Sequence, residues 1–143
     1  MNGKRSFPEE MLRVLGQGRG LLIRAGSGGH RFIGIWHVMV KDRVFVRSWS
    51  VKENGWYRMF FPEAGTRKGA RHGAIQVKKQ EVAVVAKRVS NQKLRDAIDR
   101  AYLEKYKTPG ALKYAKDLCS AKSRATTTEL LPEEKAVKDS KSV

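Results

Sequence analysis

The longest run of strand-like residues lies in the first half of the chain. Phe32 to Val40 and Arg43 to Trp49 are almost entirely apolar, aromatic or β-branched, a composition that favours extended strands. Lys41-Asp42 between them has the length of a tight hairpin turn. The pattern therefore predicts a long β-hairpin in which Val40 faces Arg43.

This register places apolar side chains on both faces of the hairpin, since directly opposed residues share a face. One face would carry Trp36, Val38, Phe45, Arg47 and Trp49, and the other Ile35, His37, Met39, Val44, Val46 and Ser48. A sheet with two apolar faces has to be covered on both sides. We therefore expect a small barrel packed against a helix or against a second subunit.

Shorter patterns surround this hairpin. Pro8 and two glutamates precede a few apolar residues and predict a short helix over 7–16. Residues 21–24 predict a first strand. A short helix over 56–61, with a cap near Asn54, is favoured over another strand. A second hairpin is expected over 70–89, with its turn at Lys79-Gln80.

The clearest helix pattern runs from 91 to 106. Its apolar residues recur at a spacing of three or four, and Ser90 is the expected cap. Thr108-Pro109 predicts the start of another short helix, and the threonine-rich segment 124–131 predicts the closing strand. Together the patterns predict a mainly β, α+β fold: an antiparallel barrel of about six strands with a packed helix near the C-terminus.

Three regions follow from these patterns. Residues 1–20 would form a helical and glycine-rich lead-in, residues 21–131 the barrel domain, and residues 132–143 a disordered charged tail. No run is long and apolar enough for a membrane span, and the N-terminal residues lack the apolar core typical of a signal peptide. We therefore expect a cytoplasmic protein without a membrane partner. The single cysteine, Cys119, excludes an intramolecular disulfide.

The charge of the chain favours anionic partners. It has 30 Lys and Arg against 14 Asp and Glu, a formal net charge of +16. Nucleic acid, an acidic membrane surface and a phosphorylated small molecule all fit such a charge. Because the basic residues are spread along the chain, only the charge itself supports nucleic-acid binding.

The usual signatures of self-contained catalysis are missing from the sequence. The three histidines, His30, His37 and His72, lack the spacing of metal ligands, and no serine-nucleophile motif occurs. No catalytic residue is assigned and no metal is predicted. If the protein is an enzyme, a bound cofactor would carry the chemistry.

Several basic residues are candidates for an anion site. Arg24, Ser27 and Arg31 flank or belong to a glycine-rich turn whose N–H groups would bind an anion, although such turns are often merely mobile. Arg71 lies in a basic loop that is either an anion site or solvated surface. Arg47 is in the middle of the hairpin, where a buried guanidinium needs a partner.

Few acids lie near Arg47 in the sequence. A bound phosphate, shared with Ser48, would satisfy its guanidinium. The alternative is a structural arginine stacked on Trp36 or Trp49. The aromatic residues, Trp56 among them, would either fill the core or line a ring-binding site.

The order of these elements resembles a bacterial family of uncharacterised domains. That family is similar to the FMN-binding split β-barrel superfamily of pyridoxamine 5′-phosphate oxidases and deazaflavin-dependent nitroreductases. The resemblance rests on Arg24, Gly26, Arg31, Trp36, Val44, Arg47, Ser48, Trp56, Tyr57, Arg58, Gly69, Ile98, Ala101, Tyr102, Lys105, Tyr106, Thr126 and Pro132.

The resemblance implies a homodimeric split barrel that binds FMN or a deazaflavin in a cleft near the subunit interface. It implies that Arg31, Arg47 and Ser48 bind the phosphate, and that Trp49 and Trp56 line the ring site. All the residues assigned to cofactor binding are Arg24, Ser27, Arg31, Trp36, Arg47, Ser48, Trp49, Trp56 and Arg71.

Three functions follow as hypotheses. The first is a flavin or deazaflavin nucleotide-binding protein that acts as an oxidoreductase, for instance a reductase. The second is a cofactor-free module of the same fold that binds another small anion. The third is a basic nucleic-acid-binding protein, for which charge is the only support.

Overall fold

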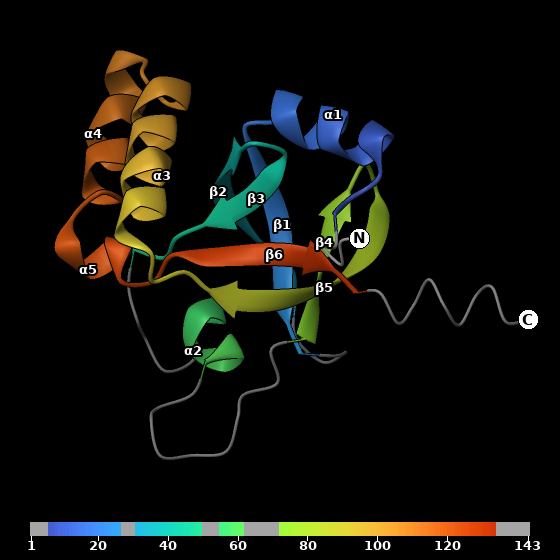
Figure 1. Ribbon diagram of the computed structural model, residues 1–143. Coiled ribbons are helices and arrows are strands. Elements are labelled where there is room, and N and C mark those ends of the chain that lie inside the picture. The colour runs from blue at the N-terminus through green and yellow to red at the C-terminus, as the bar shows by residue number, and fades with distance from the viewer. Residues whose placement is uncertain (1–5, 27–30, 50–54, 62–71, 134–143) are drawn as a thin grey trace, which may run out of the picture.

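The protein is built around a closed barrel of antiparallel strands (Figure 1). The computed structural model describes residues 6–26, 31–49, 55–61 and 72–133. Within these ranges the strands follow the order β1-β2-β3-β6-β5-β4 around the barrel. They are β1 (Gly20–Ala25), β2 (Ile33–Val40), β3 (Arg43–Val46), β4 (His72–Val77), β5 (Gln80–Arg88) and β6 (Thr128–Pro132). The predicted mainly β, α+β fold with a barrel core is confirmed.

The two predicted hairpins have nearly the expected registers. In the β2–β3 hairpin Val40 is opposite Arg43, as predicted, and both residues of the Lys41-Asp42 turn have positive φ angles of 50° and 64°. This is the backbone of a type I′ turn, whose twist matches that of the strands. The β4–β5 turn lies at Lys78-Lys79, one residue earlier than predicted, because Gln80 already pairs with its partner strand.

Both faces of the β2–β3 hairpin are covered within the chain. Val44 and Val46 point into the barrel interior, whereas Val38 and Phe45 pack against Tyr102 of α3 (Gln92–Lys105) and its neighbours. A second subunit is therefore not needed to cover this hairpin. The homodimer stays a prediction, but covering the paired residues of this hairpin is no longer an argument for it.

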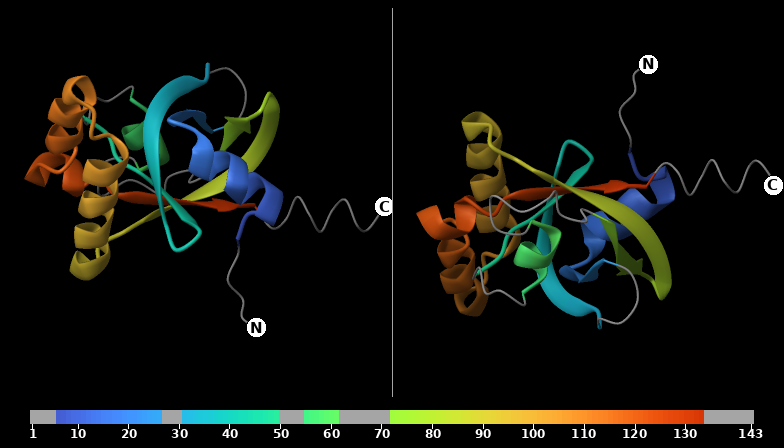
Figure 2. Two further views of the ribbon diagram at one scale, coloured as in Figure 1. Left: turned by 90° about the horizontal axis from the view of Figure 1, so that it is seen from above. Right: turned by 90° about the horizontal axis from the view of Figure 1, so that it is seen from below.

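The helices close and flank the barrel (Figures 1 and 2). α1 (Glu9–Gln17) lies at one end and α2 (Trp56–Phe60) at the other, and both place side chains in the main core. α3 packs beside β2, with α4 (Pro109–Asp117) and α5 (Ala121–Arg124) next to it. None of the helices in the described ranges is long and apolar enough to cross a membrane.

Three predicted boundaries are wrong. α3 begins after Asn91, whose side-chain oxygen accepts a hydrogen bond of 2.8 Å from the Leu94 N–H, so Asn91 takes the capping place expected of Ser90. β3 ends at Val46 and not at Trp49. The closing strand begins at Thr128 and not at Arg124, which is the last residue of the short helix α5. The cap expected at Asn54 and most of the predicted tail lie outside the described residues.

Candidate functional site

Three of the predicted site residues meet at one pocket. Arg24 comes from β1, Arg31 from the segment that leads into β2, and Trp56 from the start of α2. The pocket has a volume of about 180 Å³. Apolar side chains complete its lining: Ile23, Ala25, Ile33 and Met59. The barrel brings these segments together because α2 packs against β1.

Arg24 is the most unusual residue of this pocket. Its side chain is only 16% exposed, and its Nη2 donates to Glu81 Oε2 at 2.7 Å. Its guanidinium lies 4.6 Å from the ring centre of Phe32, within the range of a cation–π contact. Its Nε, however, is buried and has no hydrogen-bond partner among the described residues. An unpartnered buried donor is costly, and an acceptor such as a phosphate or carboxylate oxygen would satisfy it.

The other walls suit a ligand that is partly apolar. Arg31 is exposed, and Ile33 exposes 44% of its surface. Trp56 is buried, with its ring edge-on to those of Tyr57 and Phe60. Pockets for drug-sized ligands have volumes of about 300–1,000 Å³, so the described residues fit a phosphate and its neighbouring atoms and not a complete nucleotide.

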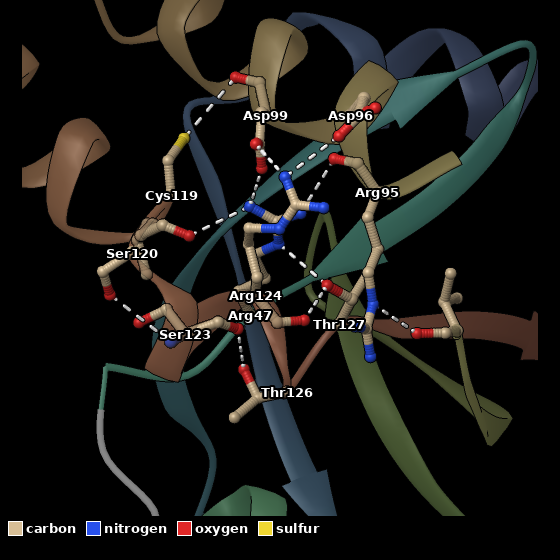
Figure 3. Close-up of polar contacts among 12 residues, drawn as sticks. Arg47, Arg95, Asp96, Asp99, Cys119, Ser120, Ser123, Arg124, Thr126 and Thr127 are labelled. Atoms are coloured by element: carbon tan, nitrogen blue, oxygen red, sulfur yellow. Dashed lines mark hydrogen bonds and ion pairs between the residues drawn. The ribbon is translucent and has the colours of Figure 1, made fainter. Parts of the chain in front are cut away.

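Arg47 lies in a different place, inside a network of polar side chains beside α3 (Figure 3). Its Nη1 donates to Asp99 Oδ1 at 2.5 Å and to the Leu118 carbonyl oxygen at 3.0 Å. Its Nε donates to Thr127 Oγ1 at 2.9 Å, and its Nη2 to the Arg95 carbonyl oxygen at 3.1 Å. The premise that Arg47 lacks an acid is therefore wrong, because Asp99 supplies it. No ligand is needed to satisfy this guanidinium.

Asp99 also joins the network to α5. Its second oxygen accepts a hydrogen bond of 2.6 Å from Arg124, which also donates to Asp96 and Gln92. The backbone carbonyl of Asp99 accepts a weak hydrogen bond from the Cys119 thiol, and burial raises the pKa of this thiol, which favours its protonated form. The network thus connects α3 and α5 with the ends of β3 and β6.

Ser48, the next residue after Arg47, also lies outside the pocket of Arg24. Its backbone N–H donates to Thr126 Oγ1 at 2.8 Å, and the residue is buried. Among the described residues, neither Ser48 nor Arg47 lines the pocket of Arg24. The hairpin pair that the resemblance assigned to the phosphate is therefore not brought together with Arg31 in this pocket.

The remaining aromatic candidates lie against α3 and α4. Trp36 stacks on Tyr106 with ring centres 4.0 Å apart and an angle of 5° between the planes. Trp49 is 5.8 Å from Trp36 and is 45% exposed, with its ring edge-on to that of Tyr114. Neither tryptophan lines the pocket of Arg24. Two further predicted residues, Ser27 and Arg71, lie outside the described residues.

A buried basic pair, which sequence reasoning did not single out as a pair, lies near the contact of α1 with β2. His37 Nε2 donates to the Leu15 carbonyl oxygen at 2.7 Å, and burial together with the charge of Lys105 lowers the pKa of His37 to about 4. The Lys105 ammonium donates to the His37 carbonyl oxygen at 2.8 Å. Burial and the charge of Arg19 lower the pKa of Lys105 to about 8. His37 is thus an inward-facing residue.

Within the described ranges, no group of three or more His, Cys, Asp or Glu could bind a metal ion.

Residues 22–130 match a family described as an uncharacterized protein conserved in bacteria, DUF2255. The chain belongs to this family. The predicted resemblance to an uncharacterised bacterial family is therefore confirmed for this DUF2255 member. No curated protein was found to match the sequence.

Solved structures with little sequence identity resemble this DUF2255 chain in fold. The crystal structure of a conserved hypothetical protein from Mycobacterium tuberculosis has a TM-score of 0.50 at 11% identity, over 91% of this chain and 82% of that chain. The crystal structure of a FAD-binding protein from Mesorhizobium loti has a TM-score of 0.51 at 16% identity, over 92% of this chain and 93% of that chain. At such identities the likeness shows a common fold.

Proposed function

We propose that the protein binds a flavin or deazaflavin nucleotide, with the phosphate in the pocket of Arg24, Arg31 and Trp56. The observation that carries the proposal is the buried Nε of Arg24, which has no partner among the described residues. A phosphate oxygen would accept from this Nε in a short, charge-assisted hydrogen bond. Arg31 would add a second positive charge at the exposed side of the pocket.

Two further observations support the proposal. The pocket borders apolar side chains, Ile33 and Met59 among them, which suit the carbon skeleton next to a phosphate. One structure with a similar fold is that of a FAD-binding protein.

A bound flavin or deazaflavin would supply hydride transfer, so the reaction class we propose is that of an oxidoreductase. The chain's own residues would bind and orient the nucleotide. Arg24 is suited to this task because its guanidinium is already fixed by Glu81 and Phe32. A fixed donor loses little side-chain freedom on binding.

The first experiment is to record the visible spectrum of the purified protein and to identify bound small molecules by mass spectrometry. FMN and a deazaflavin are then titrated into ligand-free protein. We expect Arg24→Met to weaken FMN binding by about 10- to 100-fold, the usual cost of losing a hydrogen bond to a charged group. The proposal is overturned if the protein binds neither FMN nor the deazaflavin.

Arg13→Met is the matched control, because it removes the same charge from an exposed ion pair on α1. It should leave FMN affinity unchanged if the site, and not the net charge of +16, determines binding. Pyrophosphate serves as a competitor. If pyrophosphate binds as tightly as FMN, the protein is the cofactor-free anion-binding module of the second hypothesis.

A further inference from the structure

A groove on the outer face of the β1–β2 ribbon is separate from the pocket described above. It is lined by residues 19–22 of one segment and 34–36 of the other, and its volume is about 370 Å³. Leu22 is 39% exposed at this surface. The pocket of Arg24 is found one residue pair further along both strands, where Ile23 and Ile33 contribute to its lining.

The glycine at the centre of the groove is not explained by the fold. A Cβ at Gly34 would meet one side-chain atom of Leu22 at 3.7 Å, an ordinary contact. At Gly20, by contrast, a Cβ would come within 2.7 Å of the Ile35 carbonyl oxygen, so the barrel itself requires glycine there. Glycine inside a strand weakens the strand and often marks a place where a ligand approaches the backbone. Gly34 leaves the sheet surface open to such an approach.

Trp36 provides a fixed aromatic wall for this groove. Its ring is stacked on Tyr106. The Tyr106 hydroxyl has two carbonyl oxygens within hydrogen-bond distance, those of His37, at 2.8 Å, and Arg19, and it donates its single proton between them. Burial raises the pKa of this hydroxyl, which therefore stays a donor. The orientation of Trp36 is thus set before any ligand arrives.

The polar end of the groove is basic. Arg19 lines it next to Gly20, and its guanidinium lies 5.8 Å from the ring centre of Tyr106. Arginine presents a planar set of donors to acceptor groups. A ligand that fits these walls is flat and apolar over Gly34 and carries hydrogen-bond acceptors at the edge that faces Arg19.

We infer that this groove binds a flat aromatic ring system over Gly34, between Leu22 and Trp36, with its acceptor edge toward Arg19. The ring belongs either to the nucleotide proposed above, whose phosphate would lie in the pocket of Arg24, or to a separate aromatic molecule. Both sources share the same chemistry. Only the first of them rests on the proposed function.

Riboflavin, which has a flat ring with acceptors and no phosphate, is the probe. Binding is measured by the anisotropy of riboflavin fluorescence. Wild-type protein should bind it, and Gly34→Leu, which fills the groove, should raise the dissociation constant at least tenfold. Gly34→Ala, which adds a single contact, should give an intermediate value and serves as the test if the leucine variant fails to fold.

Gly110→Leu is the control, because a Cβ at Gly110 meets nothing within 4 Å and this residue lies in α4, outside the groove. It should bind riboflavin like the wild type. The inference is overturned if riboflavin does not bind up to its solubility limit, or if folded Gly34→Ala and Gly34→Leu both bind it as the wild type does.

Titrations with FMN then separate the two sources of the ring. If the ring belongs to the nucleotide, FMN binds more tightly than riboflavin and both Gly34→Leu and Arg24→Met weaken it. If the ring is a separate molecule, Gly34→Leu weakens riboflavin binding but leaves the FMN affinity of the phosphate site unchanged. If Arg24→Met has no effect on FMN while Gly34→Leu abolishes riboflavin binding, the phosphate site fails and the groove stands.

Discussion

Arg47 and Asp99 form an ion pair from which water is largely excluded. The Arg47 side chain is fully buried, and that of Asp99 is 20% exposed. Removal of one partner from a buried pair typically costs about 3–5 kcal/mol. Arg124 still pairs with Asp99, but the loss of Arg47 also leaves Thr127 Oγ1 and two carbonyl oxygens without its hydrogen bonds. Arg47→Met should therefore lower the free energy of unfolding by about 3 kcal/mol or more, as measured by urea denaturation.

Arg13→Met provides the comparison, since the Arg13–Glu10 pair is 60% and 73% exposed. Exposed pairs contribute at most about 1 kcal/mol, so this variant should be nearly as stable as the wild type. If the Arg47→Met protein is stable but has lost FMN binding, Arg47 has a ligand-binding role after all.

His37 should make the stability of the protein depend on pH. Its pKa is about 4 in the folded protein, against about 6.5 in an unfolded chain. The unfolded state therefore binds more protons between these values, and stability falls as the pH drops from about 6.5 towards 4. At about 1.4 kcal/mol per pKa unit, the loss is roughly 3 kcal/mol over the whole window.

Denaturation curves between pH 5 and 7 measure this effect best, because most carboxylates stay ionised there. His37→Gln keeps a donor for the Leu15 carbonyl oxygen, with which His37 Nε2 makes a hydrogen bond of 2.7 Å, and does not titrate. The slope of stability against pH should be markedly smaller in this variant. An equal slope would mean that other groups cause the dependence.

The turn between β4 and β5 can be replaced by a more favourable turn sequence. Lys78 and Lys79 have φ angles of 50° and 68°, a left-handed conformation that disfavours ordinary side chains. Asn-Gly is the preferred sequence for such a type I′ turn. The double substitution Lys78→Asn and Lys79→Gly should raise the free energy of unfolding by roughly 1 kcal/mol. A lower melting temperature would contradict the turn type.

The strands and most helices follow from local patterns. The β2–β3 register was predictable because a two-residue turn leaves one pairing, and it is the one observed. The helix α5 was not predictable, because four residues, Ala121–Arg124, carry too little periodicity. The partner of Arg47 was also hidden, since Asp99 is 52 residues away in the sequence and packing of α3 alone brings it near.

The sequence predicted that the candidate site would bind an anion, but it did not predict which residues would come together there. Arg24 and Arg31 were recognised as candidate anion ligands because they flank a glycine-rich turn. That Trp56 joins them depends on how α2 packs against β1, which no local pattern determines. The sequence alone could not show that Gly34 leaves open space on the sheet. This is visible only in the barrel, where the space beside Gly34 can be compared with that beside Gly20.

At the scale of the whole molecule, assembly is still a prediction. The paired rings of Trp49 and Tyr114 expose 45% and 46% of their surfaces, and burial of such aromatic surface would favour association. Light scattering at micromolar concentration in moderate salt should return twice the mass of the 16.2 kDa chain. A monomer mass would contradict the homodimer, and a dimer that persists in Trp49→Ser would place the interface elsewhere.

The net charge of +16 should give the protein a weak affinity for any nucleic acid. Such binding releases counterions from the phosphates, so it falls steeply between about 50 and 200 mM salt and does not depend on sequence. We expect oligonucleotides of different sequence to bind alike in low salt and to dissociate over this range, as measured by fluorescence anisotropy. Arg24→Met should bind them almost as the wild type does, because it removes one of 30 basic residues, although it weakens FMN binding. A preference for one sequence, or binding that survives high salt, would instead support a nucleic-acid-binding protein, since charge alone produces neither.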